Sequence, residues 1–171
     1  LHHTPRMISV RPHRAFLLVA SLLLAAWFTA GCRSTAAPVA GEIALKVATF
    51  NLRYAGAKPP NSWPERRPVM QECWRRLDAD IIGTQEGLYP QLKDIAADQP
   101  DYDWIGLGRD GGSRGEFMAV FYRGARLEPL EFDHFWLSDT PEVMASATWG
   151  NSNRRMVTWI RFRERATGRE F

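Results

Sequence analysis

The pattern of hydrophobic and polar positions divides the chain into three parts. Residues 15–28 are apolar without a single charge, and three arginines precede them. This run of about 14 residues is shorter than the roughly 20 that span a bilayer, so residues 1–32 are predicted to be an export signal. Residues 33–42, rich in Ala, Ser, Thr and Pro, predict a flexible tether. The third part, residues 43–171, has the pattern of a folded domain.

The folded part begins with a strand, a helix and a second strand. Residues 43–50 are β-branched and aromatic in the manner of a buried strand, and residues 80–86 form a second such run. Between them, Ser62 and Glu65 have the spacing of a capping box, which predicts the start of a helix. Apolar residues three and four apart then mark one face of that helix: Val69, Met70, Cys73, Trp74 and Leu77.

This order of elements places two polar side chains at one edge of a sheet. A helical crossover joins parallel strands, which therefore finish at the same edge. Asn51 follows the first strand and Glu86 ends the second. We expect Asn51 and Glu86 to emerge side by side at the carboxyl edge, where open α/β sheets bind ligands.

The remaining sequence predicts a short helix and more strands. Two of these strands are expected to pair antiparallel with each other, because only a tight turn at Gly124 separates them. Hydrophobic and polar residues alternate imperfectly in the last strand, so the sequence does not decide which of its faces is buried. In order, the elements are a helix over 90–98 and strands over 102–107, 116–123, 127–137 and 156–163.

The balance of charge excludes one class of function. The sequence holds 22 basic and 19 acidic residues, and three of the basic but none of the acidic residues lie in the predicted export signal. The rest is therefore neutral, which argues against a nucleic-acid footprint over the whole domain.

Thr29-Ala30-Gly31-Cys32 resembles the lipobox of bacterial lipoproteins, although Thr29 replaces the usual leucine. This predicts an exported protein anchored in a membrane by a lipid on Cys32, with secretion after cleavage near Ala40 as the alternative.

Several polar residues near strand ends have ordinary explanations when each is taken alone. Glu86 and Glu116 could be solvated carboxylates, and Arg155 a solvated cation. Cys73 is predicted to be a buried thiol on its helix face. His134 is the only histidine beyond the export signal, so a mechanism that needs a histidine base has to use it or a residue outside this chain.

Six segments of the sequence form a recognisable series when they are taken together. They are Thr49-Phe50-Asn51-Leu52-Arg53, Asp80 to Glu86, Gly106 to Gly111, Gly115-Glu116-Phe117 with Phe121 to Arg123, Phe135 to Pro141, and Arg155 to Trp159. In this order they resemble the endonuclease/exonuclease/phosphatase superfamily, and the Phe-Trp-Leu-Ser sequence is most similar to secreted bacterial members. The resemblance implies a four-layer α/β/β/α sandwich over residues 43–171, of which this chain holds the first sheet and its helices. It also implies hydrolysis of a phosphodiester or phosphomonoester.

The resemblance also implies a role for each matched residue. Glu86 corresponds to a metal-ligating glutamate, and Asn51 to an amide that helps to hold metal and phosphate. Carboxylate and amide oxygens suit Mg²⁺ or Mn²⁺. Glu116 corresponds to the acid that orients the catalytic histidine, and Arg155 to a cation that meets a phosphate oxygen. An activated water attacks phosphorus in this chemistry.

The sequence lacks three motifs that are typical of the superfamily. Asn-Thr-His-x-Asp, Gly-Asp-x-Asn and Ser-Asp-His do not occur, and His134 matches no catalytic histidine. We therefore expect an N-terminal fragment that is inactive alone. Two other functions stay open: a non-enzymatic surface lipoprotein, and a glycosidase that uses Glu86 and Glu116 as paired acids. The sequence identifies no protein partner.

Overall fold

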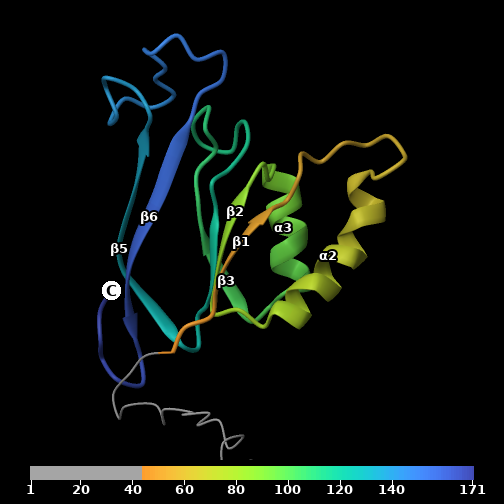
Figure 1. The fold of residues 1–171 in the computed structure, drawn as a ribbon, viewed down its shortest axis with the longest axis vertical. Helices are drawn as coiled ribbons and strands as arrows, with labels where there is room; N and C mark the ends of the chain where they lie inside the picture. The colour runs from red at the N-terminus through yellow and green to blue at the C-terminus, as the bar shows by residue number, and fades with distance from the viewer. Residues whose placement is uncertain (1–43) are drawn as a thin grey trace, which may run out of the picture. The chain divides into compact units, whose positions relative to one another are not determined.

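The computed structural model describes residues 44–171, so the predicted export signal, the lipid on Cys32 and the tether lie outside the described residues. No helix in the described part is long and apolar enough to cross a membrane. The elements (Figure 1) are, in chain order, β1 (Val47–Asn51), α2 (Trp63–Leu77), β2 (Ile81–Gln85), α3 (Tyr89–Asp98), β3 (Tyr102–Ile105), β4 (Val120–Arg123), β5 (Leu127–Trp136) and β6 (Met156–Glu164).

The strands form two sheets. A four-stranded sheet has the order β1-β2-β4-β3, and β5 pairs with β6 in a separate two-stranded sheet. β1 and β2 are parallel and adjacent, as the crossover predicts, while β4 is antiparallel to both of its neighbours. Helices α2 and α3 cover one face of the larger sheet, and the β5–β6 pair lies on its other side (Figure 1). The fold is therefore mixed α/β, as predicted, and the chain contributes strands to both sheets.

The expected pairing of the strands on either side of Gly124 is wrong. β4 runs antiparallel between β2 and β3, whereas β5 pairs along its length with β6. The physical reason is that β4 is occupied at both edges, so the chain leaves the first sheet at this turn and enters the second. The turn sequence predicts a reversal of direction but does not specify which strand is the partner.

The prediction of a buried Cys73 is also wrong, because the helix packs through a narrower stripe than the apolar pattern indicates. Trp63, Met70 and Trp74 are buried, whereas Cys73 is exposed. The Trp74 ring lies in the centre of the core, 5.0 Å from the Phe121 ring and in contact with two further aromatic rings. Cys73 lies to one side of this stripe, where it lines a pocket with Phe50 and Asn51 of β1, an edge strand of its sheet.

A second apolar cluster joins the two sheets. Tyr122 of β4 packs with Leu127 of β5 and Phe162 of β6, and all three are buried. The rings of Tyr122 and Phe162 are 5.0 Å apart. The order of layers is therefore helices, four-stranded sheet, apolar layer, and two-stranded sheet.

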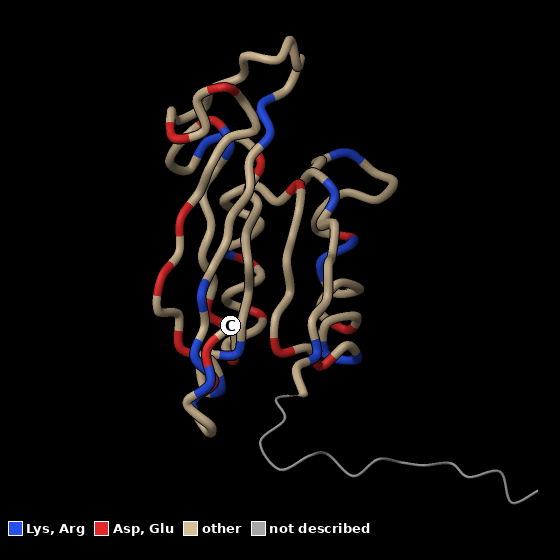
Figure 2. The backbone as a smooth tube through the Cα atoms, turned by 60° about the vertical axis from the view of Figure 1, so that its left-hand side comes forward, with Lys and Arg blue, Asp and Glu red and all other residues tan. Residues whose placement is uncertain are grey.

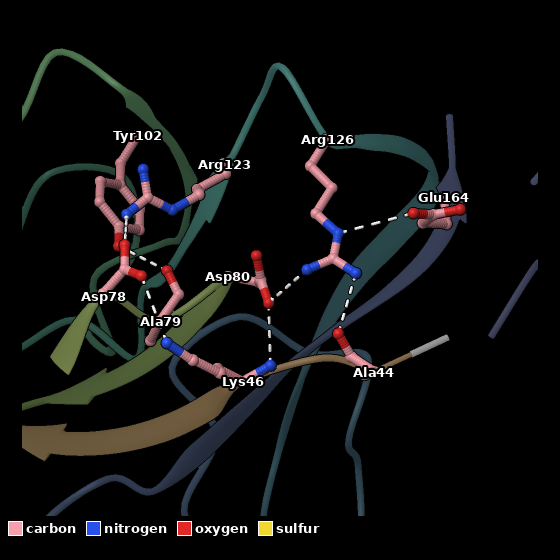
Figure 3. A network of polar contacts seen from close by, with 9 residues as sticks. All are labelled: Ala44, Lys46, Asp78, Ala79, Asp80, Tyr102, Arg123, Arg126 and Glu164. Atoms are coloured by element: carbon pink, nitrogen blue, oxygen red, sulfur yellow. Dashed lines mark hydrogen bonds and ion pairs between the residues drawn. The ribbon is translucent and has the colours of Figure 1, made fainter. Parts of the chain in front are cut away.

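An ion-pair network centred on Arg126 reinforces this junction (Figure 3). Its guanidinium is 2.7 Å from the Asp80 carboxylate and 3.5 Å from that of Glu164, and it donates a hydrogen bond to the carbonyl of Ala44. Asp80 and Glu164 are both buried. Acidic and basic residues lie close together at the lower end of the domain in Figure 2. The strands β1 and β2 point away from this end (Figure 1). Arg126 therefore fixes how β5 and β6 sit relative to the first sheet.

Candidate active site

Asn51 and Glu86 meet at the carboxyl edge of the parallel strands. Asn51 is the last residue of β1, and Glu86 directly follows β2. Nδ2 of Asn51 donates a hydrogen bond to Oε1 of Glu86 over 2.9 Å. The backbone N–H of Tyr54 donates to the other carboxylate oxygen over 3.2 Å. The structure thus brings together the two side chains that the sequence places at this edge, although their roles as metal ligands stay predictions.

The backbone turns sharply at both strand ends. Glu86 has φ +62° and Arg53 has φ +55°, which is the left-handed region that non-glycine residues seldom adopt. The Arg53 N–H donates to Oδ1 of Asn51 over 2.7 Å, so the turn holds the amide by its oxygen while the nitrogen faces Glu86. Left-handed residues of this kind occur often at functional sites.

Two side chains that the sequence analysis did not identify stabilise the turn after β1 through its backbone carbonyls. The Arg66 guanidinium donates hydrogen bonds to the carbonyls of Leu52, Arg53 and Tyr54, the shortest being 2.6 Å to Leu52. Buried Gln91 donates to the carbonyls of Leu52 and Arg53. In the sequence, Arg66 has the pattern of a solvated helix residue, and nothing marks Gln91 as a turn contact. We call these two residues the turn clamp.

The site is electrostatically suited to an ionised carboxylate. The hydrogen bond from Asn51, followed by the one from the Tyr54 backbone, holds the pKa of Glu86 below its usual value. The charges of Arg155 and Arg109 lower the pKa of Glu86 further. Glu86 is therefore negative at neutral pH, with two arginine cations close enough to act on it. Sequence reasoning singled out Arg155 but assigned no role to Arg109.

Glu116 pairs with Arg109. Their side chains are 2.8 Å apart, and each is only 17% exposed. The Arg109 N–H also donates to the Glu116 carbonyl over 3.0 Å, which closes the glycine-rich loop between β3 and β4. His134 lies on β5, where its ring contacts the Thr158 hydroxyl at 3.0 Å. The role predicted for Glu116, orienting a catalytic histidine, stays a prediction, since its partner within the described residues is Arg109.

Contacts from the second sheet position the arginines. The Trp136 indole donates to the carbonyl of Arg109 over 2.8 Å. The N–H of Leu137 donates to the carbonyl of Arg155 over 2.8 Å, which holds the exposed Arg155 beside the end of β5. These bonds link the loop between β3 and β4 to the β5–β6 pair, so both sheets contribute to the site.

The donor set fits a hard divalent cation. Glu86 supplies carboxylate oxygens, and Mg²⁺ is commonly held by one or two carboxylates while it keeps several waters. The amide oxygen of Asn51 already accepts the Arg53 N–H, so it would reach a metal only through its second lone pair. Among residues 44–171, no group of three or more His, Cys, Asp or Glu side chains could hold a metal ion. A structural zinc site, which takes four nitrogen or sulfur ligands, is therefore a poor fit here.

No family model and no curated protein matches the sequence, but solved structures do. An endonuclease/exonuclease/phosphatase from Bacteroides vulgatus is 36% identical, with a TM-score of 0.74 over 76% of this chain and 51% of its own. A family protein from Bacteroides thetaiotaomicron is 41% identical, with a TM-score of 0.71 over 74% of this chain and 47% of its own. A mannosyl-6-phosphatase from the same species is 40% identical, with a TM-score of 0.70 over 75% and 49%.

These similarities confirm the family predicted from the sequence. The chain belongs to the endonuclease/exonuclease/phosphatase superfamily, a superfamily of phosphoester hydrolases, and it has the α/β fold of these proteins. It spans about half the length of the solved structures that it matches.

Proposed function

We propose that the protein is a metal-dependent phosphoesterase in which Asn51 and Glu86 hold Mg²⁺ or Mn²⁺. The observation that carries this proposal is the hydrogen-bonded Asn51–Glu86 pair, with the charges of Arg109 and Arg155 acting on its carboxylate. A site for a cation alone gains nothing from nearby arginines, which repel it. A site for a cation together with a phosphate gains from both, because the arginines bind the phosphate oxygens.

Different residues of the site bind and orient the phosphate ester in this proposal. Arg155 is exposed and free to meet a phosphate oxygen, while the pairing with Glu116 fixes Arg109. In the proposed reaction, water forms a new bond to phosphorus as the ester P–O bond breaks, and the alcohol leaves with a proton. A bound divalent cation supplies Lewis-acid stabilisation of the charge that develops on the phosphate. The hydrogen bonds to Glu86 keep it ionised and available as a ligand.

A sugar phosphate is a candidate substrate, because one similar solved structure is a mannosyl-6-phosphatase. The proposed location is the cell envelope, with a lipid on Cys32 as the membrane anchor. Replacement of Cys32 by Ala then releases the protein from membranes. Membrane association that persists in Cys32→Ala contradicts the lipid anchor without affecting the proposed activity.

Activity is best tested in two proteins. One is residues 1–171, and the other is a chimera in which the second half of the Bacteroides vulgatus protein follows Phe171. We expect the chimera to hydrolyse phosphoesters with Mg²⁺ or Mn²⁺, to lose activity with a chelator, and to lose it again in Glu86→Gln. Residues 1–171 are expected to be inactive.

The same experiment separates the alternatives. Chelator-resistant cleavage of a glycoside supports the glycosidase, because paired carboxylates need no metal. A folded chimera that hydrolyses neither phosphoesters nor glycosides supports a non-enzymatic lipoprotein. Chelator-sensitive hydrolysis by residues 1–171 that His134→Ala abolishes contradicts the assignment of the catalytic base to a residue outside this chain.

A further inference from the structure

A polar pocket lies beside the candidate active site. The loops before β4 and before β6 lie at the end of the domain to which the strands β1 and β2 point (Figure 1). Residues of these loops line an open pocket of about 350 Å³. Arg109 lines this pocket and pairs with Glu116 at 2.8 Å. The next residue, Phe117, donates its N–H to the carbonyl of Gly87, which follows Glu86, and Arg154 of the pocket directly precedes Arg155. The pocket therefore adjoins the site. The lining residues are Arg109, Asp110, Ala145, Ala147, Asn151, Ser152, Asn153 and Arg154.

The charges that line the pocket are already paired. Arg109 is balanced by Glu116, and Arg154 by Asp110 at 2.8 Å. Arg154 also donates a hydrogen bond to the carbonyl of Ala145 over 2.7 Å, which fixes the loop that carries it. A pocket with balanced charges does not favour a second phosphate, because an additional anion has no unpaired cation to meet. This argues against a nucleic-acid backbone or a polyphosphorylated ligand here.

The uncharged side chains of the pocket have hydrogen-bonding capacity to spare. Asn151, Ser152 and Asn153 make no hydrogen bond to any other residue within 44–171. Amides and hydroxyls both donate and accept, as sugar hydroxyls do. The other uncharged lining residues are alanines, so the pocket offers neither the aromatic face on which a nucleobase stacks nor the apolar walls that an acyl chain needs.

We propose that this pocket binds the uncharged, hydroxyl-rich part of a phosphate monoester whose phosphate lies at Asn51, Glu86 and Arg155. The inference rests on the proposed function and narrows its substrate to a polyol or sugar monophosphate. Arg109 is shared between the pocket and the phosphate site, so it is the residue that joins the two halves of such a ligand. Asn151, Ser152 and Asn153 provide the hydrogen bonds that recognise hydroxyl groups.

Binding to the 171-residue chain tests the proposal without requiring activity. The probes are inorganic phosphate, phenyl phosphate, glucose 6-phosphate and myo-inositol 1-phosphate, each titrated with Mg²⁺ present and followed by amide NMR shifts. We expect at least one polyol phosphate to bind about tenfold more tightly than phosphate or phenyl phosphate. The difference between the glucose and inositol probes identifies which polyol the pocket prefers.

Variants connect the gain in affinity to the pocket. In Asn151→Ala/Asn153→Ala, the advantage of the polyol phosphate over phosphate is expected to disappear, while the affinity for phosphate itself stays the same. Lys58→Ala, an exposed change in the loop between β1 and α2, serves as the control and is expected to keep the full advantage. Thermal unfolding of each variant shows that it is folded.

Failure of this proposal is distinguishable from failure of the proposed function. If phosphate binds with Mg²⁺ but the polyol part adds no affinity, the pocket proposal is overturned and the phosphate site stands. If polyol phosphates bind more tightly but the double variant retains the advantage, the pocket is also the wrong place. If no phosphate compound binds even at high Mg²⁺, both proposals are overturned.

Discussion

Nδ2 of Asn51 lies 2.9 Å from Oε1 of Glu86, although 35 positions separate the two residues in the sequence. Parallel pairing of β1 with β2 brings them together, since Asn51 is opposite Gln85 in the register. The bond explains why β1, an edge strand with no fully buried residue, ends on an amide: the amide keeps a neighbouring carboxylate ionised and directed toward the open edge. This relationship supplies the most direct test of the site.

Replacement of Asn51 by Ala is expected to raise the pKa of Glu86. Asn51 is the largest cause that lowers this pKa, and the variant keeps only the Tyr54 hydrogen bond and the two arginine charges. Titration of the Glu86 carboxyl by ¹³C NMR measures the change. An unchanged pKa in a folded Asn51→Ala variant contradicts the hydrogen bond as its cause.

The lowered pKa of Glu86 also determines the direction in which the stability of the fold changes with pH. Because the folded pKa of Glu86 lies below the unfolded one, its ionised form stabilises the fold at pH values above the unfolded pKa. This stabilisation is lost as the pH falls through the folded pKa. The loss occurs in the acidic range below about pH 4.5 and is smaller in Asn51→Ala.

The turn clamp is expected to act on the site through the backbone. In Arg66→Met the Tyr54 carbonyl loses its donor, and the carbonyls of Leu52 and Arg53 keep only the longer bonds from Gln91. The turn that presents two N–H groups to Asn51 and Glu86 is therefore held less firmly. We expect a stability loss of about 1–3 kcal/mol and a rise in the pKa of Glu86. Urea denaturation and NMR titration measure the two effects.

A variant on the same helix separates positioning from general destabilisation. Arg75 pairs with Glu72 on the exposed face of α2 and does not contact the turn. Arg75→Met is expected to leave the pKa of Glu86 unchanged. If Arg66→Met lowers stability but leaves that pKa unchanged, Arg66 supports the fold only and does not position the site.

The sequence predicts the parts of this structure that depend on local pattern. The capping box at Ser62 forms, with its N–H bonded to the Glu65 carboxylate over 2.8 Å, and the short crossover leaves the strands before Asn51 and Glu86 parallel. The contribution of Arg66 could not be predicted, because its acceptors lie 12 to 14 positions away in the sequence and are backbone atoms. The pairing of Arg109 with Glu116 could not be predicted either. The two residues lie in an irregular glycine-rich loop, where no sequence period indicates which side chains come into contact.

Arg126 is expected to hold the two sheets together. Arg126→Met removes the ion pairs with buried Asp80 and Glu164, which leaves two buried carboxylates without their cation. We expect a loss of about 1–3 kcal/mol in the free energy of unfolding, because hydrogen bonds to charged groups are lost. Arg165→Met, an exposed change nearby, is the control and is expected to cost much less. Equal losses in the two variants contradict a specific role for Arg126.

Glu86→Gln is expected to weaken Mg²⁺ binding while leaving the fold intact. The amide has nearly the same shape as the carboxylate but no charge, and a hard cation prefers charged oxygen ligands. Glu86 is half-buried at an open strand end, outside both apolar clusters, so the variant is expected to stay folded and to lose only the stability that the ionised carboxylate contributes. Mg²⁺ affinity, measured by calorimetry, is expected to fall at least about tenfold.

A second carboxylate provides the matched comparison for this last change. Glu116→Gln also neutralises one acid near the site, but it acts on Arg109, whose guanidinium is 2.8 Å away. We expect it to change phosphate affinity, because Arg109 loses its partner, while Mg²⁺ affinity changes much less than in Glu86→Gln. Equal losses of Mg²⁺ affinity in both variants point to the total negative charge of the edge, and contradict Glu86 as the ligand.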